Sequence, residues 1–343
     1  MPQTDPKPHF VQTHLSDPSA VRAELQGGLL ATPAHIAPKF LYDALGSRLF
    51  DAITELPEYY PTRTEANIFA QHGAAMARHL PASAVLMDLG AGSCAKAARL
   101  FPVLQPAGYV AVDISVDYLR DALGALQQRH PKLPMLGLGM DFSSRLALGP
   151  AAADWLHSRD LQGAPRTVFY PGSSIGNFDP AQALTLLRQA HALCREGGPG
   201  SGLLIGVDLV KPTAVLEPAY DDALGVTAAF NRNLLLNVNR WLGSDFAPAQ
   251  WQHKAFFNEL ESRIEMHLLA LHTQTVRWPG GERVFAAGEG LHTESSYKWK
   301  PAAFEALLNE AGFGSVRLWS DERQWFGVFA ATAGDAGVPS QPR

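Results

Sequence analysis

The chain has 343 residues, 46% of them hydrophobic, so it can bury the core of one large domain or of two ordinary ones. Its 28 Lys and Arg residues against 33 Asp and Glu residues give a net charge of −5. No basic run is present to neutralise a phosphate backbone, which excludes nucleic acid as an expected partner. The beginning of the chain lacks the charged and apolar regions of a signal peptide, and no apolar run approaches the roughly 20 residues that span a bilayer. Two cysteines are too few for a disulfide scaffold. We therefore expect a globular cytoplasmic protein without a membrane partner.

Residues 10–64 do not fit the pattern of alternating strands and helices that follows them, and they contain a helical pattern. The apolar residues that recur there at helical spacing are Phe40, Leu41, Leu45, Leu49 and Ile53.

Residues 65–210 alternate between short β-like runs and helical patterns. This alternation is typical of a parallel sheet covered by helices on both faces. The runs that we expect to form strands are 84–90, 108–115, 134–142, 166–174 and 201–210.

Residues 211–298 depart from this alternation again, beginning with a proline break. They contain a predicted long helix at 221–242 and β-like runs at 262–278 and 282–299. Together with residues 10–64, this segment is expected to form a second, smaller domain.

The end of the chain distinguishes between two Rossmann-like plans. Residues 301–313 predict a helix that stops near Gly312, and the runs 315–320 and 326–332 predict an antiparallel hairpin. This ending resembles S-adenosylmethionine-dependent methyltransferases, whereas nicotinamide dehydrogenases continue with parallel crossovers. We therefore expect an α/β, Rossmann-like class I methyltransferase fold, with a doubly wound sheet and a C-terminal antiparallel hairpin. Its methyltransferase domain comprises 65–210 and 299–335, and 336–343 are expected to form a flexible tail.

The stretch DLGAGSCAK, residues 88–96, lies between the first expected strand and a helix. Gly90 and Gly92 permit a tight bend and a close approach of the backbone to a nucleotide-like ligand. The third glycine of a dinucleotide fingerprint, which serves packing beneath a pyrophosphate, is missing from this stretch. S-adenosylmethionine has no pyrophosphate, so the turn suits this methyl donor.

Acidic and aromatic residues end the next two expected strands. Asp113 follows the glycine turn by about twenty residues, where a carboxylate accepts hydrogen bonds from both ribose hydroxyls. Asp141 and Phe142 offer a polar and an aromatic contact for adenine. The carboxyl ends of parallel strands meet at one crevice, which strengthens the prediction of a donor site.

The chemistry of methyl transfer requires no metal. A sulfonium is already a good methyl donor, so the protein needs chiefly to align a nucleophile and exclude water. The twelve histidines form no HExxH pair and no Cys/His cluster, and we expect them to be surface or packing residues. Cys94 is likewise interpreted as a packing residue rather than a nucleophile.

Four stretches closely resemble the histidine-specific N-alpha-methyltransferase family of ergothioneine biosynthesis, and the likeness covers nearly the whole chain. These stretches are 40–65, 172–178 (GSSIGNF), 219–233 and 286–299 (AAGEGLHTESSYKW). The resemblance implies an enzyme that transfers three methyl groups from S-adenosylmethionine to the α-amino nitrogen of L-histidine. The mono- and dimethylated intermediates lead to hercynine, with S-adenosylhomocysteine as the other product. The second domain is then the substrate-binding domain, which holds the amino acid against the donor.

The resemblance also implies roles for individual residues. Asn177 and Tyr220 correspond to residues that grip the amino and carboxylate groups of the substrate, as an amide and a phenol are able to do. Glu294 and Ser296 correspond to the residues that contact the imidazole. The other substrate positions are Tyr42, Phe50 and Tyr59, which hold the ring or line its pocket, and Gly172 and Ser174 in the GSSIGNF motif, with Tyr42, Asn177 and Tyr220 counted as catalytic. The donor positions are Gly90, Lys96, Asp113, Asp141 and Phe142.

Several of these residues also admit a purely structural interpretation. Glu294 and Ser296 lie two apart in a β-like run, so they share a face while Thr293 and Ser295 point away, and that face is otherwise an ordinary solvated one. In the structural interpretation, Asn177 belongs to the turn before a helix that Asp179 caps and Pro180 begins. Tyr220 then packs on the sheet, and Lys96 is then an ordinary solvated lysine on a helix. Thr62 and Glu65 have the spacing of a capping box and receive no catalytic role.

Three other functions remain open. One is a methyltransferase of another amine such as tryptophan, one is a nicotinamide oxidoreductase, and one is a regulator that binds the donor without catalysis.

Overall fold

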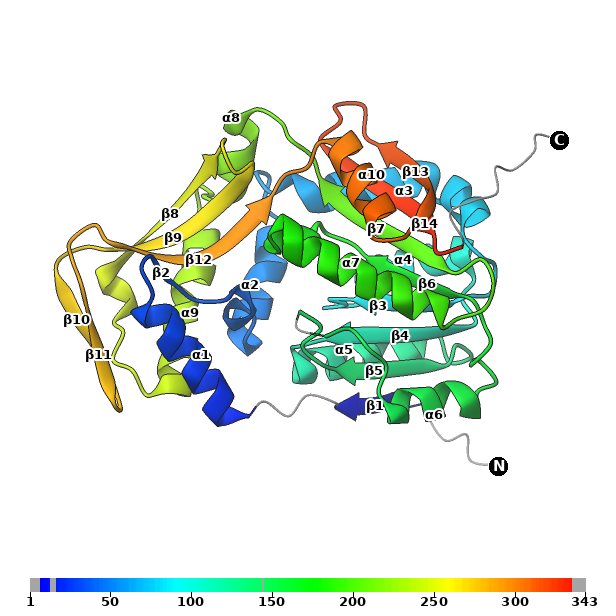
Figure 1. Cartoon of the computed structure of the whole chain (residues 1–343), viewed down its shortest axis with the longest axis horizontal. Helices are drawn as coiled ribbons and strands as arrows, with labels where there is room; N and C mark the ends of the chain where they lie inside the picture. The colour runs from blue at the N-terminus through cyan, green and yellow to red at the C-terminus, as the bar shows by residue number, and fades with distance from the viewer. Residues whose placement is uncertain (1–6, 13–16, 144, 335–343) are drawn as a thin grey trace. The chain divides into compact units, whose positions relative to one another are not determined.

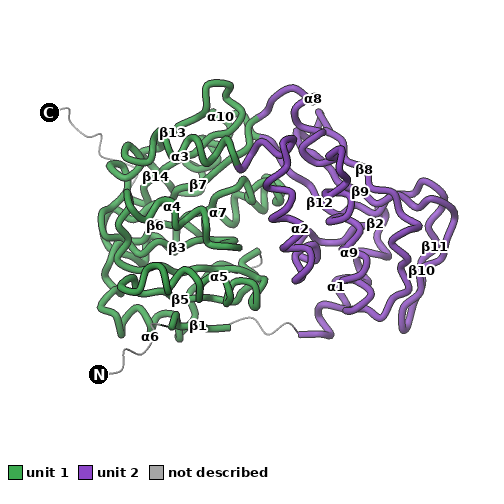
Figure 2. The backbone as a smooth tube through the Cα atoms, turned by 180° about the vertical axis from the view of Figure 1, so that it is seen from behind, with its two compact units in different colours: residues 1–14, 63–209, 299–343 green, residues 15–62, 210–298 purple. Residues whose placement is uncertain are grey.

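The computed structural model describes residues 7–12, 17–143 and 145–334, which form two compact units. Unit 1 comprises Met1–His14, Arg63–Leu209 and Trp299–Arg343, and unit 2 comprises Leu15–Thr62 and Val210–Lys298 (Figure 2). The tail predicted at 336–343 lies outside the described residues.

Unit 1 is built on an eight-stranded sheet of order β1-β5-β4-β3-β6-β7-β14-β13 (Figure 1). The strands from β1 to β7 run parallel to their neighbours, and β14 pairs antiparallel with both β7 and β13. The strands are β1 (His9–Gln12), β3 (Val85–Leu89), β4 (Gly108–Asp113), β5 (Met135–Gly139), β6 (Arg166–Tyr170), β7 (Gly202–Asp208), β13 (Gly314–Ser320) and β14 (Phe326–Thr332).

Helices cover both faces of this sheet because its central strands are apolar on both sides. Val85 and Met87 of β3 join a core with helices α6, α7 and α10, whereas Leu86 joins a core with α3, α4 and α5. The helices are α3 (Tyr60–His79), α4 (Ala95–Leu104), α5 (Val116–Arg129), α6 (Pro150–Ser158), α7 (Pro180–Arg195) and α10 (Pro301–Glu310), and η2 (Ser174–Asn177) is a short 3₁₀ turn.

The five predicted parallel strands and the C-terminal hairpin are confirmed, with boundaries that differ by a few residues. The N-terminal strand β1 was not predicted, and its residues were assigned to the second domain. It pairs in parallel with β5, where Gly137 lies opposite Phe10. A Cβ on Gly137 would come within 2.4 Å of the Phe10 ring, so the glycine makes room for this strand.

Unit 2 combines a four-stranded sheet of order β2-β12-β9-β8 with a separate hairpin and three longer helices. Helix α9 packs against α1, α2 and the strands β8 and β9. The strands are β2 (Ala34–His35), β8 (Trp251–Asn258), β9 (Arg263–Ala270), β10 (Gln274–Trp278), β11 (Gly281–Phe285) and β12 (Gly290–Tyr297). The helical elements are α1 (Pro18–Leu30), η1 (Pro38–Leu41), α2 (Ala44–Thr54), α8 (Thr213–Leu216), η3 (Glu217–Ala219), α9 (Val226–Leu242) and η4 (Pro248–Gln250).

Local capping explains where the helices start. The predicted helix at 221–242 begins only at Val226, because the Asp222 carboxylate accepts from the N–H groups of Val226 and Thr227. Asp179 caps α7 with Pro180 in its first turn, as predicted.

The predicted capping box at Thr62 and Glu65 is wrong. Helix α3 already begins at Tyr60, so both residues lie inside it.

Among the described helices, none combines the length and the apolar composition needed to cross a bilayer.

Candidate active site

The glycine turn after β3 is tied to the end of β4. Gly90 and Gly92 adopt φ values of 68° and 50°, which glycine adopts without a steric cost. The N–H groups of Gly90 and Ala91 both donate to the carbonyl of Val112, at 2.9 and 3.0 Å. The N–H of Gly92 donates to Asp113 Oδ2 at 2.8 Å. The structure thus brings the turn and the predicted ribose-binding carboxylate together.

The Asp113 carboxylate is oriented and buried. Its Oδ1 accepts from the N–H of Ser115 at 2.8 Å. Burial raises the pKa of Asp113, and the hydrogen bonds from Ser115 and Gly92 oppose this rise.

The end of β5 lies next to the same turn. A Cβ on Gly90 would lie 3.9 Å from Phe142 Cζ, and the Phe142 ring meets Tyr170 edge-on at 5.8 Å between centroids. Asp141 accepts hydrogen bonds from both the N–H and the hydroxyl of Ser143. Gly90, Asp113 and Phe142 are therefore grouped at one end of the parallel strands, with Asp141 beside them in sequence.

Lys96, in the first turn of α4, is held by a buried carboxylate. Its ammonium lies 2.8 Å from Glu65 Oε2 in an ion pair, and Glu65 Oε1 accepts from the N–H of Gly172 at 2.7 Å. Gly172 has φ 77°, and a Cβ there would come within 2.6 Å of Lys96 Nζ. Lys96 is therefore not a simple solvated helix lysine, and Glu65 is a site residue that the capping-box interpretation missed.

Cys94 is a packing residue in the same turn. It is buried, and burial together with the nearby Asp88 raises the pKa of its thiol to about 12. A thiol that stays protonated at neutral pH is a poor nucleophile, which agrees with the prediction from the sequence.

The GSSIGNF motif forms the 3₁₀ turn η2 after β6. Ser174 and Asn177 begin and end this turn, and both are partly buried. The buried hydroxyl of Ser173 accepts from the N–H of Asp208 at 2.9 Å, which fixes the turn to the end of β7.

Aromatic rings gather in unit 2 around the predicted substrate residues. Tyr42 meets Phe50 and Phe230 edge-on, with ring centroids 5.6 and 5.5 Å apart. Phe50 meets Tyr59 at 6.1 Å, and Tyr59 meets Tyr220 at 6.4 Å. The structure thus brings together four aromatic residues that the resemblance selected, and it adds Phe230 from α9.

The hydroxyl groups of Tyr220 and Ser296 are joined by a buried ammonium. The two oxygens lie 2.8 Å apart, and Lys298 Nζ donates to each of them at 2.8 Å. Lys298 is only 3% exposed. The Lys298 ammonium can only donate, so both hydroxyl oxygens accept from it. One of the two hydroxyl groups also donates its proton to the other, and the second hydroxyl proton is directed outside this triad of Tyr220, Ser296 and Lys298. Lys298 was missed in the sequence because nothing distinguished it from an ordinary surface lysine.

Glu294 is a buried carboxyl on the same face of β12 as Ser296. It is 7% exposed, and Ser296 is 4% exposed. Burial raises the pKa of Glu294 to about 7, although the positive charge of Lys298 acts in the opposite direction. The predicted shared face is therefore buried rather than solvated, and Ser295 points away, toward His292 Nε2 at 3.0 Å. Thr293 is buried and donates to the carbonyl of Met266, and the strand register shifts beside it, between His292 and Glu294.

Further buried polar contacts in unit 2 were also missed. His253 Nε2 lies 2.8 Å from the carbonyl oxygen of Tyr220, and its Nδ1 lies 2.9 Å from the side-chain amide of Asn231. Lys211 Nζ donates to Tyr60 Oη at 2.8 Å. These contacts join residues far apart in the chain, so no local spacing signals them.

The groups at the strand ends of unit 1 fit an adenosyl methyl donor. A buried carboxylate suits ribose hydroxyls, an aromatic ring suits adenine, and glycines at positive φ leave the turn without Cβ atoms. The sheet order, with a reversed hairpin at the edge, is that of the class I S-adenosylmethionine-dependent methyltransferase fold.

Comparison with known proteins gives the family. The model of the family described as "Histidine-specific methyltransferase, SAM-dependent" matches residues 21–333, and the chain belongs to this family. The chain is 40% identical over 318 residues to the histidine N-alpha-methyltransferase of Mycolicibacterium smegmatis, covering 91% of this chain and 94% of that protein. It is 29% identical to ergothioneine biosynthesis protein 1 of Neurospora crassa, covering 84% of this chain and 32% of that protein. Among solved structures, the CcbJ methyltransferase from Streptomyces caelestis matches with a TM-score of 0.44 and 17% identity, covering 82% of this chain and 94% of that one.

Proposed function

We propose that this enzyme methylates the α-amino nitrogen of L-histidine three times, giving hercynine and S-adenosylhomocysteine in ergothioneine biosynthesis. The observation that carries the proposal is the buried polar set of Glu294, Ser296 and Tyr220 in unit 2. Membership of the histidine-specific family and the 40% identity to a histidine N-alpha-methyltransferase support it.

The two units divide the task in this proposal. Unit 1 supplies the residues assigned to the methyl donor and the GSSIGNF motif, and unit 2 supplies the other residues assigned to the amino acid. In unit 1, Asp113 accepts from the ribose hydroxyls, Asp141 and Phe142 contact adenine, and the turn at Gly90 gives the donor a close approach. Lys96 binds the donor's carboxylate, and Glu65 fixes the position of the Lys96 ammonium at 2.8 Å.

Recognition of the imidazole is assigned to Glu294 and Ser296. The ring has one nitrogen that donates and one that accepts when it is neutral. Glu294 accepts from the N–H, and the Ser296 hydroxyl contacts the other nitrogen. A ligand without these nitrogens would leave buried polar groups unpaired, which is a strong basis for discrimination.

The remaining predicted residues orient the substrate. Tyr220 and Asn177 bind its carboxylate and amine, with Gly172 and Ser174 contributing from the same motif as Asn177. The rings of Phe50 and Tyr59 contact the imidazole from the aromatic cluster.

The reaction is a direct displacement by the neutral α-amine. S-adenosylmethionine, when bound, supplies an electrophilic methyl group, so the chain has to orient the lone pair and exclude water. The amine proton leaves through Tyr42 or water before each transfer. Tyr42 packs against both the Phe50 and the Phe230 rings, which limits its orientations.

The test is mass spectrometry of a reaction with L-histidine and S-adenosylmethionine, in which we expect products that gain one, two and finally three methyl groups. A panel of amino acids including tryptophan is assayed in parallel. Methylation of tryptophan but not of histidine would refute the assigned substrate. Glu294→Ala should raise the histidine KM strongly while leaving donor affinity unchanged.

A further inference from the structure

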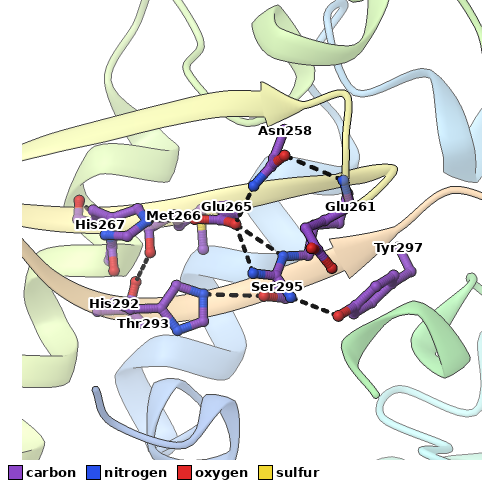
Figure 3. A network of polar contacts seen from close by, with 11 residues as sticks. Asn258, Glu261, Glu265, Met266, His267, His292, Thr293, Ser295 and Tyr297 are labelled. Carbon is purple, nitrogen blue, oxygen red and sulfur yellow. Dashed lines mark hydrogen bonds and ion pairs between the residues drawn. The ribbon is translucent and has the colours of Figure 1, made fainter. Parts of the chain in front are cut away.

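A cluster of two histidines and one glutamate lies on the four-stranded sheet of unit 2. Glu265 and His267 come from β9, and His292 comes from the neighbouring strand β12 (Figure 3). Each residue offers one ligand atom, and these three atoms all lie within 4.8 Å of one another. No local spacing signals this cluster. His267 and His292 are 25 residues apart, and Glu265 and His267 do not have the spacing of a known zinc motif.

A β-bulge at Thr293 creates this arrangement. His292 is paired with His267, but Glu294 is paired with Met266, so Thr293 is an extra residue on β12. Without the bulge, His292 and Glu294 would share a face, because they are two apart. The bulge instead turns His292 toward Glu265 and His267, on the face opposite to Glu294.

Each potential ligand is already oriented by a second contact. Glu265 Oε1 accepts from Arg263 and from the Asn258 amide, at 2.9 and 3.0 Å, which leaves Oε2 directed at His267. The His267 ring stacks on Phe256, with centroids 5.5 Å apart and planes at 19°. His292 Nε2 lies 3.0 Å from the Ser295 hydroxyl. Metal-binding histidines and carboxylates are characteristically held by such outer partners.

The distances are close to those of a metal site. Glu265 Oε2 and His267 Nε2 lie 2.9 Å apart. Two ligands of a tetrahedral Zn²⁺ lie about 3.3 Å apart, given bonds of about 2.0–2.1 Å. The metal therefore requires a small separation of this pair and a shift of the His292 ring. The two histidines are partly exposed, whereas Glu265 is buried.

We propose that Glu265, His267 and His292 bind one divalent transition-metal ion of the Zn²⁺ type. Two imidazoles and one carboxylate are ligands that Zn²⁺ prefers, and solvent completes the coordination at the partly exposed side. The ion takes the place of the proton between Glu265 and His267. It cross-links β9 to β12, so we expect it to stabilise unit 2. This proposal does not depend on the substrate assigned above.

The experiment uses the full chain, freed of any affinity tag and dialysed against EDTA. Zn²⁺ is titrated by calorimetry, and Co²⁺ is titrated as a spectroscopic probe of tetrahedral nitrogen and oxygen ligation. The variants are His292→Ala and Glu265→Gln. His272→Ala is the matched control, because His272 is an exposed histidine of the same unit outside the cluster.

We expect one equivalent of Zn²⁺ to bind the wild type and to raise its Tm. Both cluster variants should weaken the affinity at least about tenfold, and His272→Ala should leave it unchanged. The proposal is overturned if the wild type does not bind, if both cluster variants bind as the wild type does, or if His272→Ala removes the binding. Each of those results would mean that the cluster is only a hydrogen-bonded network.

A second measurement does not depend on the variants folding. Crystals of the wild type soaked in Zn²⁺ are measured at the zinc absorption edge. An anomalous peak within bonding distance of all three side chains supports the site, and its absence from this position rejects it.

Discussion

Replacing the buried Glu294 by glutamine should make the ligand-free protein more stable at neutral and alkaline pH. The carboxyl is 7% exposed, and burial raises its pKa to about 7 from an ordinary value of 4.5. A folded state with the higher pKa binds more protons than the unfolded state between these two values. Stability therefore falls as the pH rises through this window. Glutamine has the same shape but no charge to bury, so Glu294→Gln should escape this loss.

The size of the effect follows from the two pKa values. The difference between 4.5 and about 7 corresponds to about 3 kcal/mol, since each pKa unit is worth about 1.4 kcal/mol. The variant should thus exceed the wild type by about 3 kcal/mol at pH 8, and by about 1 kcal/mol or less at pH 5.

Urea unfolding followed by tryptophan fluorescence at several pH values between 5 and 8 measures this difference. Glu261→Gln is the matched control, because Glu261 is an exposed carboxylate in the same unit. Its unfolding free energy should follow that of the wild type at every pH. The same Glu294→Gln protein should bind histidine more weakly, because it has lost the anionic acceptor for the ring N–H.

Two results would refute this reasoning. One is a Glu294→Gln protein that is less stable than the wild type at pH 8. The other is a stability difference that stays constant from pH 5 to pH 8, since burial of a charge makes the difference depend on pH.

Three further substitutions test other contacts. Lys298→Met removes two hydrogen bonds from a charged group, each worth about 1.5–3 kcal/mol. We expect a higher histidine KM, and a further rise in the pKa of Glu294 because the nearby positive charge is lost. An unchanged KM and pH profile would contradict the triad. Gly90→Ala forces a residue with a Cβ to φ 68°, which should lower the free energy of unfolding in urea by about 1–2 kcal/mol and weaken donor binding. Gly124→Ala in helix α5 is the control, because the added Cβ has open space around it, and it should not destabilise the protein. Glu65→Ala leaves the Gly172 N–H without its acceptor, so the free energy of unfolding should fall by about 1–3 kcal/mol. Calorimetry should show weaker donor binding. An unchanged affinity would mean that Glu65 does not contribute to the donor site.

The sequence alone was sufficient for the fold of unit 1 except for its edge strand β1. Its central strands are short runs of apolar residues, and β3, β4 and β5 are buried along their whole length. Such runs between helical patterns indicate a parallel sheet, because a strand covered on both faces has no polar side. The hairpin after α10 was equally evident from its two β-like runs. It favoured a methyltransferase fold over that of a nicotinamide dehydrogenase.

The candidate site was only partly accessible from the sequence. Gly90, Asp113 and Phe142 follow predicted strands, so their proximity is a consequence of the sheet topology. Tyr42, Phe50, Tyr59 and Tyr220 were selected by resemblance rather than by physical reasoning, since aromatic residues at helical spacing are equally compatible with an ordinary core.

Tertiary structure decided the contacts that join distant parts of the chain. Glu65 meets the N–H of Gly172 across 107 residues of sequence, and Tyr220 meets Lys298 across 78. Burial of such charged side chains depends on what packs around them, and no local pattern encodes that environment. The bulge at Thr293 acts in the same way, because one extra residue in β12 reverses the face of every side chain before it. The sequence thus determined which segments become strands and helices, through the periodicity of their apolar residues. Only the folded chain determined which polar groups are buried together, because that depends on register and long-range packing.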